Sequence, residues 1–302
     1  MTVIRGKTSL YGIIGDPISH SLSPLFQNHF LQQTKQDAIY TPFHVLPDTL
    51  NLALLGLHAA HIQGLNITVP HKETALHLVK ADADARMIGA VNTIKRSENE
   101  WVATNTDWQG FAAVLQGLQA DVSNAPVLLF GAGGTAKAVI HALAQAGAKK
   151  IYVCNRSVER VEQLIYQSKD KYAIEIIRLA WQQDDINQAC TQCKTIINTT
   201  SIGLQQDDVF PFSITGGGVA IDAVYKPKGN TAFTLTASSG GYHTADGLPM
   251  LIAQGIASFA FWHHDDIQSG HINLPDGLES LHWVERQLAR QPLDLPGWGD
   301  IT

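Results

Sequence analysis

Gly131-Ala132-Gly133-Gly134-Thr135-Ala136 lies near the middle of a chain of 302 residues. The four residues before it, 127–130 (VLLF), are all apolar, as in a buried parallel strand. After it, apolar residues recur at helical spacing until Gly147, a typical residue to end a helix. A strand, a glycine turn and a helix in this order form the G-x-G-x-x-A dinucleotide pattern, whose glycines let the backbone approach a pyrophosphate. A tight turn that binds nothing is the alternative.

Strands and helices alternate on both sides of this motif, which predicts an α/β chain with parallel sheets. Before the motif, we expect a helix that begins with Ser23 as its N-cap and Pro24 at its first position. The expected strands are 10–15, 39–45, 64–68, 91–95, 101–104, 127–130, 151–155, 173–177, 195–198 and 219–223. A helical pattern at 248–262 comes after the last of these strands, so we expect it to cross back to the first domain.

The length suits two domains, each large enough to bury a core. We expect a first, discontinuous α/β domain at 1–106 and 242–302, completed by C-terminal helices. The second domain, at 107–241, is expected to be a Rossmann domain with a parallel sheet.

The composition is typical of a globular enzyme, and the cysteine usage indicates a reducing cytoplasm. The net charge of −6 without a basic block argues against nucleic acid and anionic membranes as partners. No apolar run approaches 18 residues, and residues 1–6 lack a signal-peptide core. Three cysteines without a secretory signal fit the same compartment, and Cys190 with Cys193 has no second pair to suggest a metal or redox site. The stretch 263–266 (HHDD) is interpreted as a solvated helix end rather than a metal site, so no metal is expected.

The residues that follow the next expected strand favour NADP over NAD. An NAD-binding fold usually carries Asp or Glu about 20 residues after the glycines, to hold the ribose 2′-hydroxyl. Here Asn155 occupies that place, with Arg156 beside it and Arg160 one turn later. Two guanidiniums can hold a 2′-phosphate through charge-assisted hydrogen bonds. If they are only surface charges, the two arginines would be placed unfavourably, because the N-terminus of a helix is itself the positive end of its dipole.

Two further residues suit acid–base chemistry. Pro70 is typical of a first helical turn, which places Lys72 in the positive field of a helix N-terminus. A lysine that is also partly desolvated loses its proton more readily, although a simple exposed lysine is the alternative. Asp107 has an alternative role of its own, as the N-cap of the next helix.

Four motifs of the first domain resemble those of the shikimate dehydrogenase family. Residues 15–24 (GDPISHSLSP) resemble its N-terminal loop, so that Ser21 and Ser23 would bind the substrate carboxylate. Residues 66–72 match N-x-T-x-P-x-K, which implies a substrate-site role for Thr68 and a catalytic role for Lys72. The G-A-x-N-T and N-T-D matches, 89–93 and 105–107, imply that Asn92 contacts substrate hydroxyls and that Asp107 is the partner of Lys72.

The resemblance continues up to about Trp262. Residues 155–160 (NRSVER) are similar to the family's NADP-type segment, and later matches fall at 198–201, 222–225, 245–248 and Gln254. They imply that Tyr225 and Gln254 contact substrate. The remaining expected cofactor contacts are Asn155, Arg156, Ser157, Arg160, Thr199, Ala223 and Gly247. Trp108 and Pro249 stand where the family usually has glycine, and 263–302 is longer than usual.

The resemblance therefore implies an NADP-dependent oxidoreductase acting on a CH–OH group, a shikimate dehydrogenase of chorismate and aromatic amino acid biosynthesis. It would reversibly reduce 3-dehydroshikimate, with Lys72 as proton donor and Asp107 orienting it; a close Lys–Asp pair titrates as a unit. A quinate/shikimate dehydrogenase using NAD, a catalytically silent shikimate-sensing member and a Rossmann protein acting on another small acid are the alternatives. We expect a cytoplasmic monomer or homodimer whose partners are small molecules.

Overall fold

The computed structural model describes residues 4–205 and 207–298. Their contacts divide the chain into two compact units. Unit 1 comprises 4–106 and 254–276, and unit 2 comprises 107–253, apart from residue 206, and 277–298. Each unit is built on its own six-stranded sheet, so the expected two-part α/β class is confirmed.

The sheet of unit 1 has the strand order β2-β1-β3-β5-β6-β4. Its strands are β1 (Ser9–Gly15), β2 (Ala38–His44), β3 (Gly64–Ile67), β4 (Lys80–Ala81), β5 (Thr93–Arg96) and β6 (Trp101–Thr104). We expected parallel sheets in both parts, but β5 runs antiparallel to both β3 and β6. The connection at 97–100, where the Ser97 N–H bonds the Glu100 carbonyl, accounts for the β5–β6 pair, because a hairpin this short can join only antiparallel strands.

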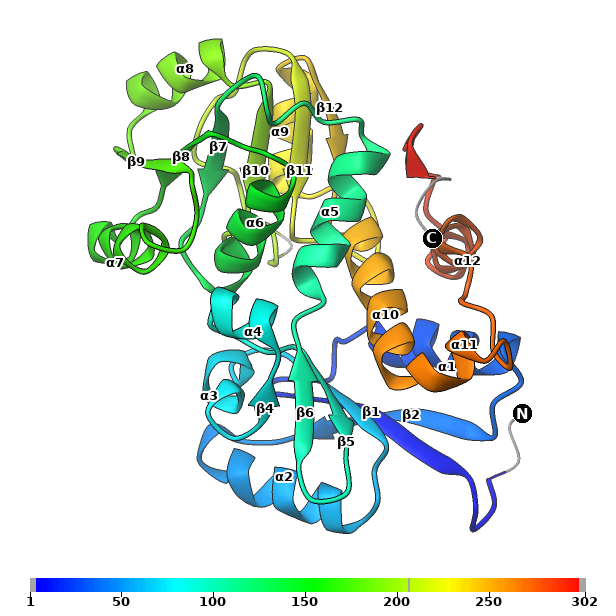
Figure 1. Cartoon of the computed structure of the whole chain (residues 1–302). Helices are drawn as coiled ribbons and strands as arrows, with labels where there is room; N and C mark the ends of the chain where they lie inside the picture. The colour runs from blue at the N-terminus through cyan, green and yellow to red at the C-terminus, as the bar shows by residue number, and fades with distance from the viewer. Residues whose placement is uncertain (1–3, 206, 299–302) are drawn as a thin grey trace. The chain divides into compact units, whose positions relative to one another are not determined.

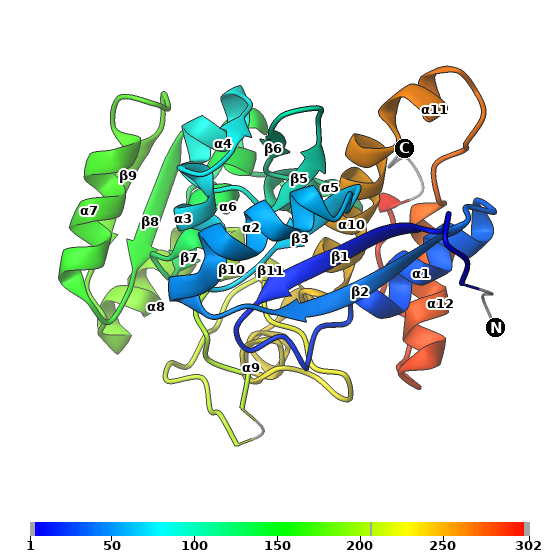
Figure 2. The same cartoon turned by 90° about the horizontal axis from the view of Figure 1, so that it is seen from below.

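Helices cover both faces of this sheet, as Figures 1 and 2 show. They are α1 (Ser23–Gln33), α2 (Leu50–Ala59), α3 (Lys72–Leu76), α4 (Ala83–Ile88), α11 (His264–Gln268) and the part of α10 (Leu248–Trp262) from Gln254 onward. Alternation along β3 sends Leu65 and Ile67 into an apolar core with α2. The opposite face carries Gly64, where a Cβ would lie 2.4 Å from the Trp262 ring of α10. Asn66 also lies on that face, and its environment becomes important below.

The start of α1 differs from the expectation. The helix begins at Ser23 itself, the N-cap is Leu22, and no side chain caps the end. The prediction of Ser23 as N-cap is therefore wrong.

The sheet of unit 2 is wholly parallel, with the order β12-β11-β10-β7-β8-β9. Its strands are β7 (Val127–Phe130), β8 (Lys150–Cys154), β9 (Glu175–Leu179), β10 (Thr195–Asn198), β11 (Gly218–Asp222) and β12 (Tyr242–Ala245). Its helices are α5 (Asp107–Gly117), α6 (Gly134–Gln145), α7 (Val158–Ser168), α8 (Gln183–Gln192), α9 (Ala232–Ser239), α12 (Gly277–Gln287) and the beginning of α10. Because strand order reverses between β7 and β10, this is a doubly wound sheet with its switch point there.

Part of the segment expected in the first domain belongs to unit 2. Residues 242–253 do so because β12 pairs with β11. Residues 277–298 do so because their hydrogen bonds reach unit 2, including Gly297 N–H to the Gly117 carbonyl at 2.9 Å. The expected return of the chain to the first domain starts within α10 and ends after α11.

Candidate active site

One edge of the unit 1 sheet gathers the ends of four strands. In the parallel pair β1 and β3, Ile14 lies opposite Ile67, so both carboxyl ends meet there. Because β5 is antiparallel, its amino end reaches the same edge, where Thr93 pairs with Asn66 on β3 and Thr104 on β6. The expected site residues Ser21, Ser23, Thr68, Lys72 and Asn92 all stand on segments that leave or enter at this edge.

The loops after β1 and β3 are tied together. The Asp16 N–H bonds the Val69 carbonyl at 3.0 Å, and a Cβ at Gly15 would lie 2.5 Å from the Thr68 methyl. Within the first loop, the Ser23 N–H donates to the Ser21 hydroxyl at 3.2 Å. The two serines therefore adjoin, Ser21 half-buried and Ser23 buried.

Lys72 is the first residue of α3 and is half-buried. Its carbonyl accepts the Val91 N–H at 3.0 Å, which fixes its backbone beside the residue that precedes Asn92. The preceding residue, His71, is buried and its Nε2 contacts the Val45 carbonyl at 2.8 Å. The core thus fixes the start of α3 and, with it, the backbone from which the Lys72 side chain extends.

A buried polar network connects two of the expected substrate residues, Asn92 and Gln254, within unit 1. The Asn92 amide donates to Thr106 Oγ1 at 2.9 Å and to Gln254 Oε1 at 3.4 Å, and its oxygen accepts the Thr106 N–H at 2.7 Å. The Asn66 amide donates to Thr93 Oγ1 at 3.1 Å and to Ser258 Oγ at 2.9 Å. Buried polar groups that are this fully bonded hold a unique arrangement.

Tyr40 extends this network toward Ser23. Its hydroxyl donates to Asn66 Oδ1 at 2.7 Å. Burial raises the pKa of Tyr40 well above its ordinary value, while a side-chain hydrogen bond with Ser23 opposes the shift. Sequence reasoning missed Tyr40, Thr93 and Ser258 as site residues. A serine four residues after Gln254 in an otherwise apolar helix was the one local signal.

Two of the expected substrate-site residues lie in unit 2. Asp107 is the first residue of α5, directly after Thr106, and is 7 % exposed. Tyr225 is half-buried in the loop after β11. Trp108, beside Asp107, packs its ring edge-on against His141 of α6, with ring centroids 5.1 Å apart.

The glycine motif forms the turn from β7 to α6 at the carboxyl edge of the unit 2 sheet. Gly131 has φ of +108°, and a Cβ there would lie 2.4 Å from Thr199 Oγ1. Gly133 is the N-cap of α6 with φ of −98°, and a Cβ there would meet nothing within 4 Å. The protein itself therefore requires glycine at 131, whereas 133 has free space facing the helix N-terminus. Such space is where a pyrophosphate is bound in this fold.

Residues 155–160 follow β8 at the same edge. Ser157 caps α7 by accepting the Arg160 N–H, and its hydroxyl donates to Glu159 at 2.8 Å. Glu159 is thereby held by the helix start, and its pKa is lowered by backbone and Ser157 hydrogen bonds. Arg156 and Arg160 are exposed, and within 4–205 and 207–298 no carboxylate is paired with either. Two unneutralised guanidiniums at a helix start suit a bound phosphate.

The other expected cofactor residues line the edge around the switch point. Thr199 follows β10, and its hydroxyl donates to the Phe130 carbonyl at 2.8 Å. Ala223 and Gly247 follow β11 and β12, and a Cβ at Gly247 would lie 2.3 Å from the Ala223 carbonyl. Ligands of doubly wound sheets bind outside the carboxyl ends of the strands, so unit 2 presents these residues where a dinucleotide is expected.

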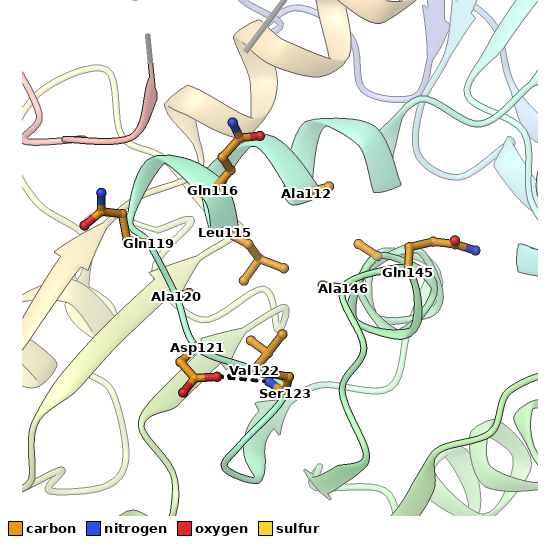
Figure 3. Close-up of a pocket in the computed structure, with 11 residues that line it drawn as sticks. Ala112, Leu115, Gln116, Gln119, Ala120, Asp121, Val122, Ser123, Gln145 and Ala146 are labelled. Atoms are coloured by element: carbon orange, nitrogen blue, oxygen red, sulfur yellow. Dashed lines mark hydrogen bonds between the residues drawn. The ribbon is translucent and has the colours of Figure 1, made fainter. Parts of the chain in front are cut away.

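A separate cavity of about 460 Å³ lies between the C-terminal ends of α5 and α6 (Figure 3). Leu115, Gln116, Gln119 and Gln145 are among the residues that line it. It lies at the amino end of the sheet and contains none of the expected site residues. Asp121 in its wall is bonded to Ser123 and Asn124 of its own turn, so its carboxylate is already satisfied.

The three cysteines and His263 are buried parts of the core and are not expected to take part in the chemistry of the site. Burial raises the pKa of Cys154 and Cys193 to about 12 and also raises that of Cys190, which disfavours the thiolate form. The prediction of a solvated helix end at 263–266 is wrong for His263, which is 5 % exposed because it packs between Tyr11 and Phe259. In the part of the chain that the structure describes, no cluster of three metal-ligating side chains is found. The described helices are also too short or too polar to cross a membrane.

Comparisons with known proteins match both units. Residues 13–94 match the model of the shikimate dehydrogenase substrate binding domain, and 113–204 match that of shikimate/quinate 5-dehydrogenase. The chain is 36 % identical over 270 residues to "Shikimate dehydrogenase (NADP(+))" of Gloeothece citriformis, covering 87 % of this chain and 93 % of that protein. The crystal structure of shikimate dehydrogenase from Aquifex aeolicus aligns with a TM-score of 0.81 at 33 % identity, covering 96 % and 100 % of the two chains. A 5-ketofructose reductase of Gluconobacter aligns with a TM-score of 0.80 at 28 % identity, covering 94 % and 100 %.

Proposed function

This chain belongs to the shikimate dehydrogenase family, and on that premise we propose that it reversibly reduces 3-dehydroshikimate to shikimate with NADPH. The main support for the proposal is the set of residues that each sheet brings together at one of its edges. In unit 1 the edge brings the Ser21–Ser23 pair, Lys72 and Asn92 to the ends of neighbouring strands. In unit 2 the edge offers a glycine turn with unpaired guanidiniums on the next strand's loop. Unit 1 is thus the proposed substrate unit, and unit 2 the proposed nucleotide unit.

The proposed roles follow from the chemistry of each group. NADPH, when bound, supplies the hydride. Lys72 donates a proton to the alkoxide as it forms, and Asp107 orients Lys72. Ser21 and Ser23 hold the substrate carboxylate through their hydroxyls, and the bond from the Ser23 N–H to the Ser21 hydroxyl supports this role because it keeps the two residues together. Thr68, Asn92, Tyr225 and Gln254 are the proposed contacts to the ring hydroxyls.

The choice of NADP rests on Asn155, Arg156 and Arg160. An acidic residue at 155 would repel a 2′-phosphate, whereas the amide of Asn155 donates to the Ser157 carbonyl at 3.1 Å and stabilises the loop. The two arginines supply charge-assisted hydrogen bonds to the phosphate. Gly131 to Ala136, Ser157, Thr199, Ala223 and Gly247 complete the proposed cofactor site.

Initial rates with shikimate and with quinate, each with NADP⁺ and with NAD⁺, test the proposal. We expect shikimate with NADP⁺ to give the highest kcat/KM of the four pairs. A preference for quinate or for NAD⁺ would contradict it. Reduction of 5-ketofructose by NADPH is a fifth assay, and an efficient reaction there would contradict the role of the serine pair, because a ketose has no carboxylate.

We also propose that the enzyme acts in the cytoplasm, as its cysteine usage favours, and that it is a monomer or homodimer. Light scattering after gel filtration measures the mass in solution, and a larger assembly would contradict the second statement. Fractionation of the source cells tests the first.

A further inference from the structure

Arg290 lies just beyond the C-terminal helix α12 and carries a buried charge within unit 2. Its side chain is 6 % exposed. Nη2 donates to Asp246 Oδ2 at 2.7 Å, and Nη1 donates to the Lys226 carbonyl at 3.1 Å. The Arg290 N–H bonds the Glu285 carbonyl at 2.9 Å, which ties the residue back to α12.

The two partners of Arg290 stand next to two proposed site residues. Lys226 directly follows Tyr225, the proposed substrate contact after β11, and Asp246 directly precedes Gly247, the proposed cofactor contact after β12. The guanidinium therefore joins two loops that leave neighbouring strands of the sheet.

The same two loops also approach each other without Arg290. The Gly247 N–H bonds the Val224 carbonyl at 2.9 Å, and Gly247 allows the Ala223 carbonyl to come closer than a Cβ would permit. Arg290 adds a second link between the two loops, from the Lys226 carbonyl to the Asp246 carboxylate. Because guanidinium is planar and donates in two directions, one side chain sets the spacing of both loops.

Stability alone does not explain a charge at this position. The attraction between two buried charges is often offset by the cost of removing both from water. Proteins in which apolar residues replace both partners are therefore often equally stable. Asp246 also accepts the Leu248 N–H at 3.1 Å, at the start of α10, so its orientation matters to the chain on either side of it. The Arg290–Asp246 ion pair is therefore suited to fixing the positions of the two loops.

We propose that Arg290 is a positioning residue for the reaction, which acts through Lys226 and Asp246 on Tyr225 and Gly247. The segment after α12, which has no other assigned role, thereby holds the substrate and cofactor loops at their working distance. This inference rests on the proposed function of the chain.

Three variants separate positioning from simple charge neutralisation. Arg290→Met removes both bonds, and Arg290→Lys keeps the charge but replaces the two nitrogens that bond Lys226 and Asp246 with a single nitrogen on a shorter side chain. The double variant Asp246→Asn with Arg290→Met leaves no unpaired carboxylate at position 246, while the introduced amide keeps an oxygen for the Leu248 N–H. Arg286→Met is the matched control, since Arg286 is an exposed arginine in the last turn of α12.

KM for shikimate, KM for NADP⁺, kcat and thermal midpoint are measured well below the midpoint of each variant, together with NADP⁺ affinity by calorimetry. We expect both KM values to rise about tenfold in Arg290→Met, because each displaced loop would lose the equivalent of about one hydrogen bond to its ligand. The double variant and Arg290→Lys should regain most of the thermal midpoint while both KM values stay raised severalfold. Arg286→Met should match the wild type.

Wild-type KM values in the double variant or in Arg290→Lys would overturn the inference, because Arg290 would then only neutralise Asp246. A wild-type enzyme that does not oxidise shikimate would instead overturn the proposed function. In that case the NADP⁺ affinities of the same variants still decide the role of Arg290 toward Gly247: unchanged affinity refutes it, and weakened affinity supports it.

Discussion

Replacing Gly133 by alanine should impair cofactor binding while leaving the fold almost untouched. Gly133 caps α6 with φ of −98° and ψ of −167°, a conformation that alanine adopts freely. The added Cβ would meet no protein atom within 4 Å. If a pyrophosphate is bound against this helix N-terminus, the methyl group would stand in its way.

The size of each effect follows from these contacts. Alanine is a poorer N-cap than glycine by roughly 0.5–1 kcal/mol, and the reduced freedom of the unfolded chain returns about 0.4–1 kcal/mol. The free energy of unfolding should therefore change by less than about 1 kcal/mol, a shift in thermal midpoint of about 2–4 °C at most. Loss of one charged hydrogen bond to the pyrophosphate costs about 1.5–3 kcal/mol, so KM for NADPH should rise roughly 10- to 100-fold.

Gly131→Ala is the informative contrast. With φ of +108°, an alanine there is strained by about 1–2 kcal/mol even before contacts are considered. Its Cβ would also lie 2.4 Å from Thr199 Oγ1 and 3.0 Å from the Thr199 carbonyl carbon, so part of the backbone after β10 must move. This variant should therefore lose several degrees of thermal midpoint, unlike Gly133→Ala.

Thermal unfolding without cofactor, and KM for NADPH at saturating substrate, are the two measurements. The reasoning is refuted if Gly133→Ala binds NADPH as tightly as the wild type. It is equally refuted if Gly133→Ala is destabilised as much as Gly131→Ala, because the free space at 133 would then have another explanation.

Three further predictions concern charged groups. Lys72→Met should lower kcat by about 10²- to 10⁴-fold while calorimetry finds normal NADP⁺ affinity, and near-normal turnover would remove Lys72 from the reaction. Arg156→Gln with Arg160→Gln should raise KM for NADPH by about 100-fold or more and leave KM for NADH unchanged; an equal loss with both cofactors would argue against 2′-phosphate binding. Burial raises the pKa of Asp222 from 3.8 to about 7, so its folded form prefers the proton and stability falls as pH rises from about 4 to about 7. Asp222→Asn should therefore gain on the wild type by on the order of a few kcal/mol between about pH 5 and about pH 8 in thermal unfolding, and a constant difference would refute the shift.

Local patterns were sufficient to predict much of the fold. The strand 127–130 and the helix 248–262 have the expected bounds, because an apolar run or a helical period is read within one element. The strand expected at 173–177 instead begins at Glu175, a shift typical of an exposed edge strand. The glycine turn was recognisable for the same reason, since its strand, turn and helix are contiguous.

Long-range pairings were not predictable. Asn66 and Ser258 bond across 192 positions, and Arg290 and Asp246 across 44, so no local period marks either pair. The antiparallel β5 also escaped the expectation of a parallel sheet, because alternation of strands and helices carries no information on a hairpin within it. Motif resemblance supplied most of the candidate site residues, but not the side chains that support them.

The return of α10 to unit 1 has a consequence for the order of events during synthesis. All six strands of the unit 1 sheet leave the ribosome by Thr104, but Ser258 and Trp262 follow more than 150 residues later. Until then the Asn66 amide lacks its Ser258 partner, and the Ile94 carbonyl lacks the Trp262 indole that bonds it at 2.9 Å. The nascent sheet thus has one face covered by α1 alone while unit 2 is translated, and a chaperone that shields apolar surface would act during this interval.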